Sequence, residues 1–294
     1  MKVRIAAARY AIGAPSHFPA FATRVASRVS QAAVRGAQVV VLPEYLALEA
    51  GASLPPAERG DFVRSLAALQ ARRDDYVELA CTLAQRHGVY LVAGSFLVDE
   101  QGAGRYRNRA WFASPDGGIG FQDKLCLTGF ERASGVIEPG DSLKVFDTAF
   151  GRIAIAICYD IEFPLYARAQ CEAGARLLLV PSCTDTEAGA NRVRYGCQAR
   201  AMENQVYVAC AVTAGNAEWS PALDVNTGRA AIYTPVDRGF PDDGIAARDD
   251  GEWAVTELDL DALDTFTPEA QVGIRTDWPQ QQRPSVVRAR VEVL

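Results

Sequence analysis

Short apolar runs alternate with segments of helical periodicity along most of the chain. Strand-like runs lie at Val3–Ala8, Val39–Leu42, Val89–Gly94, Arg109–Ala113, Ile153–Ile157, Leu177–Val180 and Val206–Val212. Helical patterns lie between them, at about residues 18–35, 57–86, 163–173 and 190–204. Several strand-like runs are apolar on both faces, and such strands need helices over the sheet to exclude water. The pattern therefore predicts an α/β protein with helices layered over sheets.

Glycines mark the ends of several predicted elements. Gly36, Gly88 and Gly174 follow helical patterns and are typical stop signals. The Asp116-Gly117 pair predicts a hairpin turn. No Pro/Gly/Ser-rich linker or block of like charges divides the chain, so we expect one domain over residues 1–294, with 275–294 as its C-terminal tail.

Composition and charge exclude some classes of partner. The 294 residues are 49% hydrophobic, which is enough for a large core, and the net charge of -6 lacks the basic excess of nucleic-acid binders. The N-terminal apolar run is short, and no stretch reaches the ~18 consecutive apolar residues of a membrane span. We therefore expect a cytoplasmic protein with neither a nucleic-acid partner nor a membrane.

The odd number and the scattered positions of the cysteines predict reduced thiols. They stand at Cys81, Cys126, Cys158, Cys171, Cys183, Cys197 and Cys210. None of the spacings is that of a zinc site, so we expect no metal. A reducing compartment explains the odd number most simply. Cys171, Cys197 and Cys210 lie inside apolar or helical patterns and are predicted to be small core residues.

Cys158 has the sequence context of a nucleophile. It ends the alternating run 152–157 and is followed, from Pro164 on, by a helical pattern. A thiol at a strand-to-helix turn is lifted out of the sheet toward a ligand. It still needs a base or a cation, because a free thiol is mostly protonated at neutral pH. The two histidines do not suit this role, since His17 lies in a loop-like stretch and His87 at a helix end.

Two other segments also place a reactive group after a strand-like run. Val39–Leu42 is followed by Pro43 and then Glu44. The segment 120–131 holds Lys124 between the carboxylates Asp123 and Glu131. A glutamate, a lysine and a cysteine could supply a base, a cation and a nucleophile, so together they form a plausible catalytic set.

These motifs, in this order, resemble the nitrilase superfamily of carbon-nitrogen hydrolases. The Glu-Lys-Cys triad of that family falls on Glu44, Lys124 and Cys158, and a second family glutamate falls on Glu131. Taken singly, each residue also has a structural interpretation, as a helix-start carboxylate, a solvated lysine or a buried thiol. Three ordered motifs are far more specific than any one of them.

The resemblance covers nearly the whole chain, because residues 199–205 and 231–235 also resemble later family segments. It implies an α-β-β-α sandwich of two mainly six-stranded sheets flanked by helices. It also implies a homodimer or larger assembly, for which helices 163–173 and 190–204 are the candidate faces.

The family chemistry can be written onto these residues. Glu44, with a pKa raised by burial, would take a proton from Cys158 and return it to the leaving nitrogen. Lys124 and the backbone amide of Tyr159 would stabilise the oxyanion. Water activated by Glu44 would then hydrolyse the thioester, and no metal or organic cofactor is needed. We expect the neighbouring residues Tyr45, Tyr159 and Thr184 to bind the substrate.

The residues after the nucleophile favour amides as substrates. Nitrile hydrolases of the family tend to carry Trp-Glu there, whereas this chain has Tyr159-Asp160. Many amide-hydrolysing relatives have arginine and glutamate where this chain has Glu162 and Leu165. Glu162 would repel acidic substrates if it pointed inward. The alternative, which the nearby helix start favours, is a carboxylate that faces solvent.

The first hypothesis is an amidase that acts on small linear amides. Segments 46–49 and 161–163 further resemble a Rim1-like nitrilase branch, whose substrates the sequence does not supply. A nitrilase, an N-carbamoyl amide hydrolase or an acyl-transferring enzyme is the alternative. A non-catalytic binding or scaffold protein is a third hypothesis, and the complete set of motifs argues against it.

Overall fold

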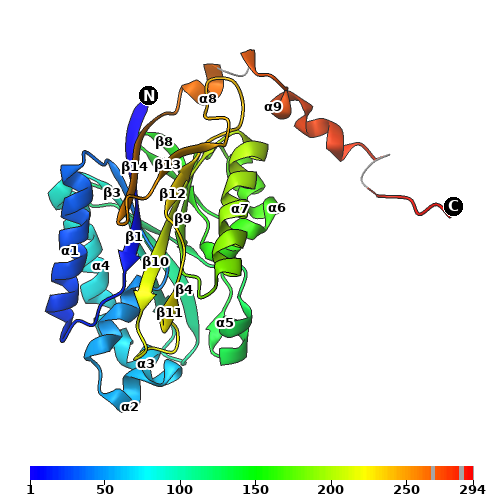
Figure 1. Ribbon diagram of the computed structural model, residues 1–294. Coiled ribbons are helices and arrows are strands. Elements are labelled where there is room, and N and C mark those ends of the chain that lie inside the picture. Colours follow the sequence, from blue (N-terminus) through cyan, green and yellow to red (C-terminus); the bar gives the residue numbers. More distant parts are fainter. Residues whose placement is uncertain (266–268, 285–287, 294) are drawn as a thin grey trace.

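Two six-stranded sheets form the centre of the protein. The computed structural model describes residues 1–265, 269–284 and 288–293 (Figure 1). The first sheet has the spatial order β5 (Ile119–Asp123), β4 (Tyr106–Ala113), β3 (Tyr90–Val98), β2 (Val39–Leu42), β1 (Lys2–Ala11) and β14 (Trp253–Asp259). The second has the order β7 (Val145–Thr148), β8 (Gly151–Ile155), β9 (Leu177–Ser182), β10 (Tyr207–Asn216), β12 (Ala231–Tyr233) and β13 (Ile245–Arg248). Two short strands, β6 (Ile137–Glu138) and β11 (Val225–Asn226), pair with β4 and β10.

The sheets are joined along one edge and packed against each other. The last residues of β1 pair in parallel with β10, so one hydrogen-bonded path runs through both sheets. Strands β2 and β3 contact β9 of the other sheet. Every residue of β2 and β9 is buried. This is the environment that their continuous apolar runs require.

Helices cover the outer faces of the two sheets. Figure 1 shows α1 (Phe18–Val34) and α4 (Arg73–His87) on one side and α6 (Pro164–Glu172) and α7 (Glu187–Asn204) on the other. The predicted α-β-β-α sandwich is therefore confirmed. The remaining helical segments are η1 (Leu46–Ser53), α2 (Pro56–Arg59), α3 (Phe62–Leu69), η2 (Gln70–Arg72), α5 (Gly129–Ser134), η3 (Cys158–Glu162), α8 (Ala262–Thr265), α9 (Ile274–Asp277) and η5 (Trp278–Gln282).

The prediction of one helix over residues 57–86 is wrong, because the segment is broken twice. Gly60 caps the end of α2, and the side chain of Asp61 accepts a hydrogen bond from the N–H of Arg64 and so starts α3. The 3₁₀ turn η2 then separates α3 from α4. Of the expected strand at residues 153–157, the last two residues lie outside β8 and lead into η3.

Both histidines are involved in helix ends. The ring nitrogen of His17 accepts a hydrogen bond from the N–H of Ala20 and caps α1. His87 is the last residue of α4, which ends at Gly88 with a φ of 64°. Neither histidine lines the cavity described below. The positions of the two histidines therefore do not suit the role of a base for Cys158.

All seven cysteines are free. Cys197 and Cys210 are buried as predicted, whereas Cys171 is only half-buried.

The last helical segments, α9 and η5, lead away from the sandwich (Figure 1). No helix in the described part of the chain is long and apolar enough to cross a membrane. The single domain and its tail stay predictions.

Candidate active site

Four chain segments meet where strands of the two sheets end. Glu44 follows β2, Lys124 follows β5, and Cys158 is the first residue of η3 just after β8. Ser182 ends β9. Strands β8 and β9 are parallel neighbours, with Ile155 paired to Leu179, so the chain leaves both strands at the same edge. Ligands of α/β proteins commonly bind at the carboxyl ends of such strands.

The turns that hold two of these residues are strained. Among the described residues, left-handed backbone occurs outside glycine only at Cys158 (φ 47°), Tyr45 (φ 61°) and Gln205 (φ 55°). Such a conformation costs a residue with a Cβ atom about 1–2 kcal/mol. Gly94 allows the turn before Tyr45 to approach β3, because a Cβ atom there would lie 2.3 Å from the Pro43 carbonyl oxygen. The surrounding structure therefore maintains two strained turns at one site.

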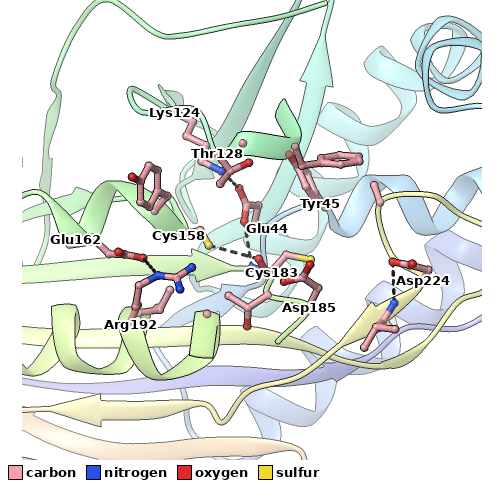
Figure 2. A pocket seen from close by; sticks show the side chains of 18 of the residues that line it. Glu44, Tyr45, Lys124, Thr128, Cys158, Glu162, Cys183, Asp185, Arg192 and Asp224 are labelled. Carbon is pink, nitrogen blue, oxygen red and sulfur yellow. Dashed lines mark hydrogen bonds and ion pairs between the residues drawn. The ribbon is translucent and has the colours of Figure 1, made fainter. Parts of the chain in front are cut away.

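Lys124 lies between two buried carboxylates. Its Nζ is 2.8 Å from Glu44 Oε1 and 2.9 Å from Glu131 Oε2, and the three side chains are at most 1% exposed. A buried ammonium group of this kind stays in place only if its charge is compensated. Figure 2 shows Lys124, Glu44 and Cys158 next to one another in the cavity.

Hydrogen bonds fix the two glutamates. The side-chain amide of Asn108, in β4, donates to Glu44 Oε1 at 2.8 Å and to Glu131 Oε1 at 3.3 Å. The hydroxyl of Tyr45 donates to Glu131 Oε1 at 2.7 Å. Glu131 also forms a capping box at the start of α5, where the N–H of Thr128 donates to its Oε2 at 2.8 Å. The structural and the functional interpretations of Glu131 are thus compatible.

Burial and charge shift the pKa values in this network. Burial raises the pKa of Glu44 above its ordinary value, and the charge of Lys124 offsets only part of that effect. Burial acts in the same direction on Glu131, but Lys124 and the Thr128 N–H lower its pKa below the ordinary value. Burial followed by the charge of Glu44 raises the pKa of the Cys158 thiol well above normal. Cys158 is therefore a thiol next to a carboxyl group of raised pKa.

The end of β9 contacts both the thiol and its neighbouring carboxyl group. The hydroxyl of Ser182 donates to Cys158 Sγ at 3.2 Å. The N–H of Cys183 donates to Glu44 Oε2 at 3.1 Å, and its carbonyl oxygen accepts the S–H of Cys158 at 3.5 Å. Two adjacent residues therefore set the relative positions of the Cys158 thiol and the Glu44 carboxyl group.

Asp160 ties the turn of Cys158 to the segment that follows Lys124. Its carboxyl group accepts hydrogen bonds from the backbone N–H groups of Leu125, at 3.1 Å, and Cys126, at 2.7 Å. Burial raises the pKa of Asp160 to about 7, although these bonds oppose the shift. The link between the lysine and cysteine motifs thus passes through one buried carboxyl group.

A cavity of about 290 Å³ opens over the nucleophile. Glu44, Lys124 and Cys158 line it together with the expected substrate-binding residues Tyr45, Tyr159 and Thr184. The hydroxyl of Tyr45 is already engaged by Glu131, whereas Tyr159 follows the nucleophile in η3, so its N–H has no acceptor within that short helix. Glu131 lies behind Lys124 and does not line the cavity.

Glu162 does not have the solvent-facing position that the helix start favoured. It is the last residue of η3, before the start of α6, and it lines the cavity (Figure 2). Its Oε1 lies 3.4 Å from the Nε of Arg192 on α7. The sequence pattern predicted the helix that begins at Pro164 but not the 3₁₀ turn η3 that holds Glu162. Asp185 and Asp224 line the same cavity.

Four residues that contact the network were not assigned a role from the sequence. They are Asn108, Thr128, Asp160 and Ser182. The Thr128-x-x-Glu131 spacing is a visible capping-box signal. The others are single polar residues at the ends or edges of apolar runs. Groups of His, Cys, Asp or Glu that could hold a metal ion are not found in residues 1–265, 269–284 and 288–293.

The sequence matches a known protein family over most of its length. The carbon-nitrogen hydrolase family matches residues 4–242. The chain belongs to this family. The chain is 36% identical over 83% of its length to "Probable hydrolase YhcX" of Bacillus subtilis, of which it spans only 46%. It is 30% identical over 72% of its length to "Omega-amidase NIT2-A" of Xenopus laevis, and the match covers 74% of that protein.

Solved structures of low sequence identity share the fold of the hydrolase. Saccharomyces cerevisiae Nit3, a member of branch 10 of the nitrilase superfamily, superimposes with a TM-score of 0.73 at 22% identity over 92% of this chain and 95% of Nit3. An amidase from Nesterenkonia, whose active-site cysteine carries acrylamide added by Michael addition, has a TM-score of 0.66 at 21% identity over 94% of this chain and 99% of that amidase. At these identities the similarity shows the fold alone, while the placement in a Rim1-like branch stays a prediction.

Proposed function

We propose that this hydrolase cleaves small linear amides through a thioester on Cys158. The observation that carries the proposal is a single cavity in which a thiol, a carboxyl group of raised pKa and a buried ammonium group meet. The omega-amidase similarity and the amidase fold support amide hydrolysis as the reaction class.

The first half of the reaction acylates the thiol. Glu44 accepts the S–H proton as Cys158 Sγ attacks the carbonyl carbon, and the π electrons of the carbonyl move to its oxygen. Lys124 Nζ and the Tyr159 N–H stabilise that oxyanion. When the tetrahedral intermediate collapses, the C–N bond breaks and Glu44 gives its proton to the leaving nitrogen. Ammonia or an amine departs, and an acyl thioester remains.

The second half returns the enzyme to its resting state. Glu44 takes a proton from a water molecule that attacks the thioester carbon. The C–S bond then breaks, the acid leaves, and the sulfur recovers its proton from Glu44. Glu131 does not touch the substrate in this scheme; it holds the charge and position of Lys124. Glu44 and Cys158 therefore take part in both halves.

Matched amides and nitriles test the bond that is cleaved. We expect kcat/KM for ammonia release to be higher for a small linear amide than for the nitrile of the same carbon skeleton. A planar carboxamide places its oxygen at Lys124 and its nitrogen near Glu44, whereas a linear nitrile needs a different route for its protons. A clear preference for nitriles would contradict the amidase proposal and leave the arrangement of the site unaffected.

The charges around the cavity bear on the substrate class. Besides the catalytic network, Glu162, Asp185 and Asp224 contribute three carboxylates, and Arg192 contributes one guanidinium group. Glu162 is partly neutralised by Arg192. Burial, the largest cause, and the charges of Glu44 and Asp185 raise the pKa of the Cys183 thiol to about 12. The charge of Asp185 therefore acts on groups inside the site. A cavity of this charge disfavours acidic substrates.

We expect an amide with a distal ammonium group to be a better substrate than one with a distal carboxylate. For 4-aminobutanamide and succinamic acid, kcat/KM should differ about fivefold or more at low salt, and the difference should shrink in Asp185→Asn and at high salt. Asp74→Asn, an exposed carboxylate on α4, is the matched control and should leave the ratio unchanged. A preference for succinamic acid would contradict this charge argument.

We also propose a homodimer formed through α6 and α7. Leu165, Tyr195 and Met202 are 78%, 59% and 40% exposed on these two helices. Large apolar side chains gathered on neighbouring helices are typical of a surface that another molecule covers. The cytoplasmic location expected from the cysteines stays a prediction.

A further inference from the structure

Ser182 has a contact that no sequence motif suggested. Its side chain is buried, with the residue 1% exposed, and it ends β9 directly opposite the turn that follows β8. In the described part of the chain, the hydrogen-bond partner of its hydroxyl is the sulfur of Cys158, at 3.2 Å. A buried hydroxyl group is stable only with a partner, and here the partner is the reacting atom.

Two neighbouring residues contact the sulfur. The Cys183 carbonyl oxygen accepts the S–H of the resting thiol at 3.5 Å. The Ser182 hydroxyl donates to the sulfur, and a donor gains strength when its acceptor becomes an anion. Burial and Glu44 both work against a thiolate at this position. Ser182 is therefore placed to offset part of the cost of forming one.

We propose that Ser182 is a catalytic hydrogen-bond donor that stabilises the Cys158 sulfur whenever it carries negative charge. That charge develops as the S–H proton moves to Glu44 while the C–S bond is still only partly formed. It develops again when the C–S bond of the thioester breaks and the electron pair returns to sulfur, until Glu44 returns the proton. The proposal deepens the proposed function, since it rests on Cys158 as the nucleophile.

Alkylation of Cys158 by iodoacetamide tests this role without any amide substrate. The rate of modification is followed from pH 6 to 10 on the tryptic peptide 153–168, which separates Cys158 from the other six cysteines. Hydrogen bonds to charged groups are among the stronger ones, so Ser182→Ala should slow alkylation at neutral pH about tenfold. On the rising part of the pH profile, the variant should reach a given alkylation rate about one pH unit above the wild type, which is the same factor.

Two further variants separate the donor from the packing. Ser182→Thr keeps the hydroxyl and should restore the wild-type pH profile, whereas Ser65→Ala removes a buried hydroxyl on α3 outside the cavity and should change nothing. If circular dichroism shows that Ser182→Ala does not fold, Ser182→Cys is used in its place, in a phosphine reductant that keeps the thiols reduced. A thiol is a weaker hydrogen-bond donor than a hydroxyl, so this variant should shift the pH profile less and in the same direction. The new thiol lies on a separate peptide, 177–192.

An unchanged pH profile in a folded Ser182→Ala or Ser182→Cys would overturn the proposal, as would a Ser182→Thr profile identical to that of Ser182→Ala. The result is distinguishable from a failure of the amidase assignment. A shifted alkylation profile together with no amide turnover would sink the amidase proposal only, whereas normal amide turnover with an unshifted profile would sink the role of Ser182 only.

Discussion

Cys158→Ala is expected to lower amide turnover by roughly four orders of magnitude or more, while the Tm stays close to that of the wild type. The change removes the atom that attacks the carbonyl carbon, and the remaining groups provide only weak catalysis. Alanine meets the same cost as cysteine in the left-handed conformation at φ 47°, and it leaves only a small void. Ammonia release and thermal unfolding measure the two quantities.

The other thiols near the site supply the controls. Cys183→Ala keeps the backbone groups that contact Cys158 and Glu44, and Cys126→Ala removes a half-buried thiol whose neighbour is the Tyr166 hydroxyl at 3.4 Å. Both variants should retain most of the turnover. Turnover that survives Cys158→Ala but is lost in either control would place the nucleophile on a different sulfur.

Lys124→Met is expected to lower both turnover and stability. Turnover should fall by about 100-fold or more, because the oxyanion loses its cation. The same change leaves Glu44 and Glu131 facing each other without a counter-charge, and breaking a buried ion pair typically costs about 3–5 kcal/mol. Glu44→Gln is the matched comparison. It removes the base but does not leave two carboxylates facing each other, because Lys124 still pairs with Glu131. Its Tm should therefore be higher than that of Lys124→Met.

The stability of Lys124→Met should depend on pH in a defined direction. Without the lysine, repulsion between the two buried carboxylates raises the pKa of one of them in the folded state. A raised folded-state pKa means that stability is present at low pH and is lost as pH rises through that value. The Tm deficit against wild type should therefore be smaller at pH 5 than at pH 8. A near-normal rate, or a deficit that grows toward pH 5, would contradict the assignment of Lys124.

Local periodicity was sufficient to predict the strands that precede Glu44 and Cys158, because both are apolar runs. The strand before Lys124, β5, has a mixed sequence and was not among the predicted strands, although the motif around Lys124 was found. The topology brings the three groups to one edge. The fold could also be predicted, because the family resemblance spans nearly the whole chain and the apolar runs require helices on both outer faces.

The hydrogen-bond partners of these groups could not be predicted in the same way. Asn108 and Ser182 contact residues that lie 64 and 24 positions away along the chain, and nothing local marks them. The inward direction of Glu162 depends on the 3₁₀ turn η3 and on Arg192 from another helix. Tertiary contacts, rather than periodicity or propensity, determine these features.

A rapid-quench measurement of intact mass during turnover of a small amide tests the thioester most directly. We expect a transient increase equal to the mass of the acyl group less one hydrogen, located on the peptide 153–168 and absent in Cys158→Ala. Steady ammonia release without a covalent adduct, or with an adduct on a different peptide, would contradict a thioester on Cys158.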